Sequence, residues 1–574
     1  MTTIIAVVGI VVYTVLYFTY GKRLETVTVK ADNANQTPAH RLYDGVDFVP
    51  ARTSVLFGHH FASVAGAAPI VGPVLAMAWG WVPALAWVWF GNIFIGAVHD
   101  YLSIMASVRY DGKSIQFVAS DLITKRTGKL FYYLVFFLLV LVVAAFAAVI
   151  GGMFMANPAI PAATIYLLIA AVILGFLIYK TKLPFIVSTL IGIVMLIGTI
   201  WAGATFPIVA PRNAWFLFMF FYIIIASALP VNVLLQPRDY LNAFLLYFGL
   251  IIGGFASIFA FGSFAAPAFT TFSPVVVAGQ PTPFWPVIPL IIACGSLSGF
   301  HSLVGSGTTS KQITSEKAVL PIGYGAMLVE GFLSTIVVIA VAGFGAQVMN
   351  TAGQAITTAN WGENYTRMMG ATFPGASMFS ETWAAMVAST WLNFIPQDFL
   401  RVIAGMWVSS FAMTTLDTTN RLGRYCVAEM AGPLKGKADG LYNALTNRWV
   451  ASLIPAAIGI WLGWSGSFSL LWPAFGSANQ LVAAIALLTG TAWVAKRLKQ
   501  KATVALIPAY GLWITVTAAI AWYTVVVIPP TIRVNPATGI TVGVIQVIMF
   551  VMNIVFIIDF IKTKDLPAAS ESQA

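Results

Sequence analysis

The chain has 574 residues, of which 59% are hydrophobic and only 9% are charged, and its formal net charge is +11. A soluble domain cannot bury that much apolar surface, so the composition excludes a soluble enzyme. Basic charge can indicate nucleic-acid binding, but here most Lys and Arg residues lie in the loops between apolar runs. This distribution excludes a nucleic-acid partner.

Apolar runs long enough to cross a membrane recur along the whole chain. A membrane-spanning helix needs about 20 mostly apolar residues, and about fifteen runs approach that length. They cover residues 3–20, 55–81, 83–108, 130–153, 162–179, 183–203, 214–235, 240–261, 286–305, 322–344, 399–416, 449–464, 468–494, 503–527 and 541–561. We therefore expect an all-α polytopic membrane protein.

The basic residues predict the orientation of these spans. With the N-terminus outside, every Lys and Arg falls in an inner loop except Arg212, Arg367, Arg401 and Arg533. The positive-inside rule then predicts an inner-membrane protein with an external N-terminus and a cytoplasmic C-terminus. The first run has no basic residues before it, so we expect a retained helix and no signal peptide.

Two further features bound the architecture. The cysteines are only Cys294 and Cys426, which excludes a disulfide framework and a cysteine-rich metal site. The longest external segment, residues 345–397, contains an apolar, Trp-containing stretch at 379–394 that is typical of a helix lying at the membrane interface, although a plain loop or an extra pair of spans would also fit.

Two runs carry a proline at mid-membrane depth. Residues 55–81 contain Gly-Ala-Ala-Pro, and residues 214–235 contain Ser-Ala-Leu-Pro. Proline removes a helix hydrogen bond, so we expect two broken helices whose freed backbone groups meet a substrate or an ion. The amides after each break would favour a carboxylate. The expected substrate-binding residues are Gly66, Ala67, Ala68, Pro69, Ser227, Pro230 and Asn232.

The two interrupted runs lie five spans apart, and an odd repeat length inverts the second copy. This spacing predicts a LeuT-like inverted five-plus-five repeat, with one helix before it and about four after it. The alternative is that membrane helices carry Gly and Pro for other reasons. The expected parts are residues 1–54, a first repeat at 55–213, a second repeat at 214–448 and the extra helices at 449–574.

Ionisable residues inside spans are costly and are expected to be functional. They are His59, His60, His99, Asp100, His301, Glu330 and Asp417. Because histidine titrates near neutral pH, these residues suggest either a proton relay or structural hydrogen bonds. A metal site formed by His59, His60, His99 and Asp100 is a further possibility, although no metal-ligand motif is present.

Hydroxyls and a lysine follow His301 at the inner end of the same run. The residues are Ser306, Thr308, Thr309 and Lys311. Hydroxyls beside unwound carbonyls can ligate Na⁺, and a lysine can replace that ion in a proton-coupled protein. Alternatively, the small residues simply let helices pack closely.

Several motifs resemble the carbon starvation protein A (CstA) family over most of the chain. They are FGHHFASVAGAAPIVGP at residues 57–73, GN at 91–92, GAVHDY at 96–101, SGTTSKQ at 306–312 and TTLDTTNR at 414–421. Members of this family are similar to amino acid/polyamine/cation carriers and are described as peptide or proton-coupled pyruvate transporters induced on starvation.

The resemblance and the residues together predict a secondary active transporter that imports a small carboxylate-bearing solute, either a peptide or pyruvate. We expect H⁺ as the coupling ion, with Na⁺ as the alternative, the solute and the lipid bilayer as partners, and no enzymatic activity. The sequence leaves the oligomeric state open. Rival predictions are a membrane redox subunit with a His-ligated haem and an intramembrane metalloprotein.

Overall fold

The computed structural model describes residues 1–45, 47–229, 234–374 and 376–563. Within them, 11 helices are long and apolar enough to cross a membrane, or 12 if one bent pair counts as a span. A short antiparallel hairpin of β1 (Val275–Val277) and β2 (Gln280–Pro281) accompanies the helices. The chain is a multi-pass, all-α membrane protein, as predicted.

The helices of the N-terminal half are α1 (Thr2–Leu16), α2 (Pro38–Arg41), α3 (Thr53–Val64), α4 (Ala68–Ala76), α5 (Trp81–Gly91), α6 (Ala97–Arg109), α7 (Ile115–Leu122), α8 (Lys125–Ala156), α9 (Ala159–Lys180), α10 (Phe185–Thr205), α11 (Arg212–Ala228) and α12 (Leu235–Phe259). Those of the C-terminal half are α13 (Phe284–Ile291), α14 (Gly299–Gly307), α15 (Ala326–Thr351), α16 (Trp361–Thr372), α17 (Ser377–Ala388), α18 (Gln397–Met430), α19 (Asp439–Thr446), α20 (Arg448–Ser465), α21 (Phe468–Lys496), α22 (Thr503–Trp522), α23 (Ile528–Val534) and α24 (Pro536–Thr563). Short π-helical or 3-10 turns extend several of them, including η1 (Tyr17–Gly21), η7 (Leu320–Gly325) and η8 (Trp391–Phe394).

Every predicted apolar run is occupied by a helix or a helix pair. Beyond the 12 spans counted above, the remaining runs are formed by α11, which has 17 residues, by the short pair α13 and α14, and by α20. The predicted number of spans was therefore higher than the number of long, unbroken apolar helices, because two of the extra runs are shorter than a full span.

The first predicted break is confirmed. Helix α3 ends at Val64 and α4 begins at Ala68, and the two axes differ by 50°. Pro69 is in the first turn of α4, where its missing N–H costs nothing and the preceding chain has to leave the helix. Pro69 therefore sets the position of the break.

The second predicted break falls between helix α11, which ends at Ala228, and helix α12, which begins at Leu235. Pro230 and Asn232 lie outside the described residues. The second interrupted run is 286–305, in which α13 ends at Ile291 and α14 begins at Gly299.

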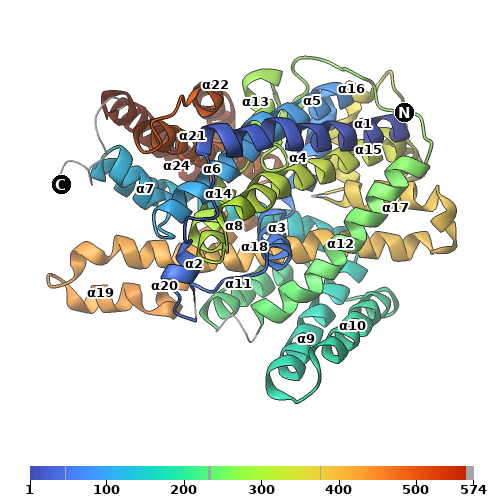
Figure 1. The fold of residues 1–574 in the computed structure, drawn as a ribbon. Helices are drawn as coiled ribbons and strands as arrows, with labels where there is room; N and C mark the ends of the chain where they lie inside the picture. Colours follow the sequence, from blue (N-terminus) through green and yellow to red (C-terminus); the bar gives the residue numbers. More distant parts are fainter. Residues whose placement is uncertain (46, 230–233, 375, 564–574) are drawn as a thin grey trace.

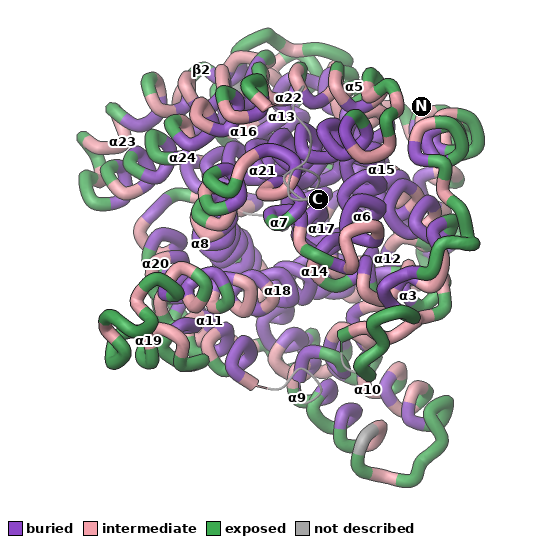
Figure 2. Tube along the Cα trace, turned by 60° about the vertical axis from the view of Figure 1, so that its left-hand side comes forward, coloured by how far each residue is buried: buried purple, intermediate pink, exposed green. Residues whose placement is uncertain are grey.

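The most buried helices form the centre of the protein, and the least buried ones surround it (Figures 1 and 2). In the most apolar stretch of each helix, 94% of the residues are buried in α21 and 89% in α8, whereas only 22% are buried in the span that begins with α1 and 28% in α10. Apolar helices that remain exposed in this way are suited to contact lipid. Helices α9 and α10 project together from the rest of the bundle (Figure 1).

The predicted interfacial helix is mostly internal. Helix α17 packs between α15 and α18, and its Phe379 and Trp383 are fully buried. Its polar side chains also find partners within the protein, since Ser380 and Thr382 bond to backbone carbonyls and Glu381 pairs with Arg401. Only the following turn, η8, exposes large aromatic side chains, Trp391 and Phe394.

Candidate functional site

The break between α13 and α14 is held open by amide side chains from other helices. Asn92 donates to the Gly295 carbonyl over 3.0 Å, and Asn479 and Gln480 of α21 both donate to the Ala293 carbonyl. Unwound backbone inside a membrane protein needs such partners, because no water replaces the lost helix hydrogen bonds. Sequence reasoning missed these residues, since uncharged amides in an apolar run carry no distinctive signal.

A small cavity lies where the two broken helices meet. Its lining is Val64, Gly66, Ala68, Val142, Phe146, Cys294, Ser298, Phe300, Thr415 and Phe475. The volume of about 20 Å³ leaves room for about one water molecule, so the protein is closed around this point. A Cβ on Gly66 would lie 2.8 Å from the Thr415 hydroxyl, which shows how tightly α18 closes against the first break.

Two of the predicted substrate-binding residues, Gly66 and Ala68, line this cavity, with Ala67 and Pro69 beside them in the same break. The α4 N-terminus has no side-chain cap, while the Pro69 carbonyl accepts a hydrogen bond from Ser334 over 2.7 Å. Ser227 does not reach the cavity. It lies at the end of α11, where its hydroxyl accepts a hydrogen bond from the Asn420 amide over 2.9 Å.

A fully buried cluster of two acids and two histidines lies behind the cavity. The ring of His301 joins the acids: its Nδ1 is 2.8 Å from Asp100 Oδ2, and its Nε2 is 3.4 Å from Glu330 Oε2. His99 Nδ1 lies 2.7 Å from the other oxygen of Asp100. The predicted residues His99, Asp100, His301 and Glu330 are thus brought together from α6, α14 and α15, while each is at most 1% exposed.

Cys294 belongs to both the cavity and the cluster. Cys294 lines the cavity, and its Sγ lies 3.3 Å from His301 Nε2. Cys294, His301 and Glu330 each offer one atom of the kind that binds metals, and within the described ranges they form the one group whose atoms lie within 4.8 Å of one another. The structure does not bring the predicted set of His59, His60, His99 and Asp100 together in this way.

The adjacent histidines of α3 point in different directions, as their helical spacing requires. His60 is buried, and its Nδ1 lies 2.9 Å from the Thr309 hydroxyl. His59 is exposed. The pair therefore contributes one side chain to the interior, and that side chain bonds to the chain just after α14.

The other hydroxyls and the lysine of this segment have local roles. The Ser306 hydroxyl accepts a hydrogen bond from the Ile115 amide at the start of α7, over 3.0 Å. Thr308 donates to the carbonyl one turn before it, and Lys311 lies 5.5 Å over the ring of Phe48. These contacts fit the packing alternative, because the residues do not converge on one ion.

Asp417 has a different partner from the other acids. It pairs with Arg238 of α12, and its Oδ2 also accepts a hydrogen bond from Tyr222 over 2.9 Å. The sequence pattern assigned Arg238 to an inner loop, which was wrong: Arg238 is only 1% exposed and lies in the first turn of α12. The sequence feature that could have indicated this burial is the position of Arg238 between two apolar runs, close to the second proline.

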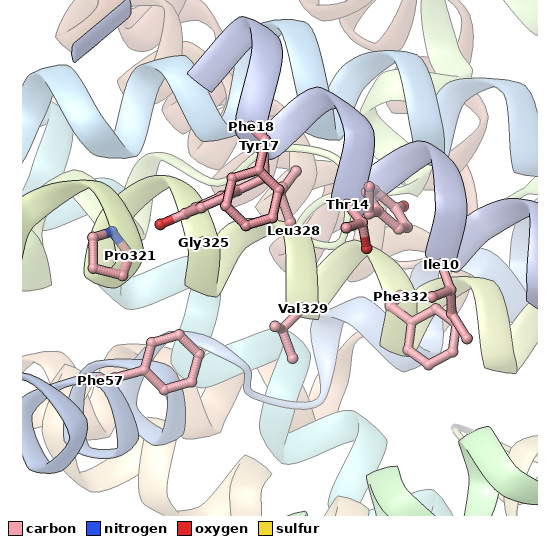
Figure 3. Close-up of a pocket in the computed structure, with 11 residues that line it drawn as sticks. Ile10, Thr14, Tyr17, Phe18, Phe57, Pro321, Gly325, Leu328, Val329 and Phe332 are labelled. Atoms are coloured by element: carbon pink, nitrogen blue, oxygen red, sulfur yellow. The ribbon is translucent and has the colours of Figure 1, made fainter. Parts of the chain in front are cut away.

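A larger crevice lies between α1, α3 and the helical segment η7–α15 (Figure 3). Its volume is about 390 Å³. The lining is Ile10, Tyr13, Thr14, Tyr17, Phe18, Phe57, Pro321, Gly325, Leu328, Val329 and Phe332. Its walls are largely apolar and include the exposed Phe18, so the crevice suits lipid contact better than binding of a charged solute.

Broken helices that meet at a closed cavity, beside buried ionisable residues, place this multi-pass membrane protein in the transporter class. The sequence matches the family described as "Carbon starvation protein CstA" over residues 1–521. The chain belongs to this family.

Individual relatives agree with this assignment. The chain is 30% identical to the peptide transporter CstA of Bacillus subtilis (strain 168), with 97% of this chain and 96% of the relative covered. It is also 30% identical to the pyruvate/proton symporter BtsT of Escherichia coli (strain K12), with 90% and 81% covered. Among solved structures, a manganese transporter of Eremococcus coleocola matches 89% of this chain and 96% of its own at 12% identity, with a TM-score of 0.40.

Proposed function

We propose that this protein is a secondary active transporter that imports a small carboxylate solute by proton-coupled alternating access. The observation that carries the proposal is the double role of Cys294, which lines the cavity and whose sulfur also contacts His301 of the buried cluster. The cavity of about 20 Å³ would have to widen to admit a solute, which would then lie next to the groups that hold the proton. The names of the two relatives, a peptide transporter and a pyruvate/proton symporter, support the same class of function.

The lining of the cavity favours a small monocarboxylate, such as pyruvate, over a peptide. The uncapped amides at the start of α4 and the hydroxyls of Ser298 and Thr415 can receive a carboxylate. Among the described lining residues none is acidic, so an α-ammonium group would find no charged partner there. The aromatic rings of Phe146, Phe300 and Phe475 complete the wall and suit a short apolar substituent.

The charge of the buried cluster supports proton coupling. With His301 neutral, Asp100 and Glu330 would place two negative charges in a fully buried site, which is costly without compensation. One proton on His301 and one on a carboxylic acid remove the net charge. We infer that the cluster takes up protons on one side of the membrane and releases them on the other, and that His60 and His99 flank this relay.

The arrangement of the helices supports an inverted repeat with altered boundaries. Each half would begin with a broken helix, α3/α4 in the first and α13/α14 in the second. The first half would continue with α5–α6, α8, α11 and α12, and the second with α15, α18, α20 and α21. Helices α9 and α10 project from the bundle and would be an insertion in the first half (Figure 1). The second half would then begin near Phe284 and not at residue 214. A Cβ on Gly72 would lie 2.7 Å from the Ile291 carbonyl, which shows that the two broken helices touch directly.

We also infer the orientation from the basic residues. The N-terminus would be external and the C-terminus cytoplasmic, in the inner membrane, because this arrangement keeps almost all Lys and Arg residues inside. In this orientation, the relay and the cavity lie between the two faces.

Uptake into proteoliposomes tests the proposal. Labelled pyruvate and a labelled dipeptide are each offered under an imposed proton gradient and then under a sodium gradient. Pyruvate accumulation that collapses with a protonophore is expected. Accumulation of the dipeptide alone would overturn the monocarboxylate assignment, and accumulation driven by sodium alone would overturn proton coupling. A metal ion bound in equimolar amount to the purified protein would also overturn the relay, because it would occupy the same atoms.

A further inference from the structure

Arg238 presents two separate edges to two separate acids. Its Nη1 contacts Asp417 and Tyr222, which lie on α18 and α11. Its other edge, formed by Nε and Nη2, contacts a single oxygen of Asp239 over 3.2 and 2.7 Å. That edge is the one that can hold both oxygens of a carboxylate at once, with two parallel N–H bonds. Asp239 engages both donors of this edge with one oxygen, a weaker arrangement than two parallel bonds to two oxygens.

The two acids differ in how firmly they are held. The side chain of Asp417 is fully buried, whereas that of Asp239 is 34% exposed and follows Arg238 directly in the chain. One acid is enough to neutralise the buried guanidinium, and the Asp417 carboxylate cannot leave without exposing a buried charge. Asp239 can exchange its contact with Arg238 for water at a much lower cost. It is the replaceable partner.

This arginine pairs with Asp417 of α18, two residues after a residue that lines the central cavity. Thr415 of α18 lines the cavity, and its neighbour Thr414 donates to Asp239 Oδ1 over 3.3 Å and accepts a hydrogen bond from Asn242 over 3.1 Å. Asn242 and Ser410, which both bond to Thr414, each have a buried oxygen without a hydrogen-bond partner, namely Asn242 Oδ1 and the Ser410 hydroxyl. These polar groups lie on the helix that closes the cavity and on the helix that carries Arg238.

We propose that the Nε–Nη2 edge of Arg238 is a second binding site for the carboxylate of the transported solute, and that Asp239 occupies this edge when no solute is bound. This inference rests on the proposed function, since it places a second binding site for the same solute at the start of α12. Solute leaving the cavity exchanges with Asp239, and the return of Asp239 to the arginine then expels it. Asp417 keeps the arginine in place throughout.

Binding measurements on the purified protein in detergent test the second site without any transport step. Labelled pyruvate is titrated by equilibrium dialysis, with acetate as a competitor that contains only the carboxylate and a methyl group. Asp239→Asn keeps the shape of the side chain and removes its charge. It is expected to tighten pyruvate binding at the second site about tenfold or more, because the competing charged hydrogen bonds disappear.

A double variant removes the site without leaving a buried charge. Arg238→Gln with Asp417→Asn neutralises the pair and is expected to reduce the number of pyruvate molecules bound per chain from two to one. The matched control is Asp398→Asn, because Asp398 forms an exposed pair with Arg401 on the same helix, far from the cavity in sequence. It is expected to bind pyruvate as the wild type does.

Two results would overturn the second site. One is an Asp239→Asn variant with wild-type affinity and stoichiometry, and the other is a double variant that still binds two pyruvate molecules. These outcomes differ from a failure of the proposed function, in which the wild-type protein itself neither binds nor transports a carboxylate. Because Asp239 is partly exposed, its substitution is compatible with folding and keeps the test decisive if the double variant does not fold.

Discussion

Replacing Glu330 with glutamine is expected to uncouple transport from the proton gradient. Glutamine has the same shape as glutamate, so packing is preserved while the negative charge is lost. At the observed 3.4 Å from His301 Nε2, a carboxylate stabilises a protonated imidazole by about 5 kcal/mol at an effective dielectric constant of about 20. Even a third of that energy corresponds to more than a tenfold change in proton occupancy. Proton-driven accumulation of solute should therefore fall at least tenfold.

Two assays on the same proteoliposomes separate coupling from substrate binding. Accumulation under an imposed proton gradient requires the relay, whereas exchange of labelled for unlabelled solute moves no net proton. The Glu330→Gln variant should keep exchange within about twofold of the wild type. Glu381→Gln is the matched control, because Glu381 pairs with Arg401 at 2.6 Å outside the cluster. A variant that accumulates solute normally, or that loses exchange and accumulation to the same extent, would refute the relay.

Three further substitutions test the cavity and its support. Gly66→Ala places a Cβ 2.8 Å from the Thr415 hydroxyl, so KM should rise several-fold with folding intact, whereas Gly440→Ala, which meets nothing within 4 Å, should leave KM unchanged. Gly72→Ala pushes against the backbone carbonyl of Ile291 at 2.7 Å and should lower the Tm of the purified protein measurably, and an unchanged Tm would show that the two broken helices can separate. Asn479→Leu removes one hydrogen-bond donor from the Ala293 carbonyl and should destabilise the fold by about 1–3 kcal/mol, measured by thermal unfolding in detergent. A stability equal to that of the wild type would mean that the unwound segment needs no amide support.

The parts of the fold that depend on local sequence could be predicted. Membrane helices follow from apolar runs, and the first break follows from Pro69, because both effects act within a few residues. The second break could not be read in the same way. Residues 286–305 look like an ordinary apolar span, and the chain unwinds there because Asn92 and Asn479 supply hydrogen bonds from helices distant in sequence.

The buried charges could also be predicted one by one from local sequence, whereas their contacts could not. Asp100 and His301 stand out in the sequence because charged and titratable groups are rare in spans, but their contact joins two residues 201 positions apart. Arg238 was assigned to a loop because an arginine near a helix end usually faces water. Its burial depends on a fully buried acid 179 positions away, Asp417, which no local pattern reveals. Cys294 drew attention only as a free thiol, since nothing in the sequence places it beside a histidine seven positions later across an unwound segment.

The amide side chains that hold the α13–α14 break have a consequence for the electrical behaviour of the protein. Each elementary charge that crosses a membrane potential of 100 mV exchanges about 2.3 kcal/mol with it, whereas neutral groups exchange almost nothing. The amides that support this segment belong to Asn92, Asn479 and Gln480 and carry no charge. The membrane potential therefore exerts almost no force on the segment. In the proposed relay, the membrane potential would act instead on the protons held at Asp100, His301 and Glu330.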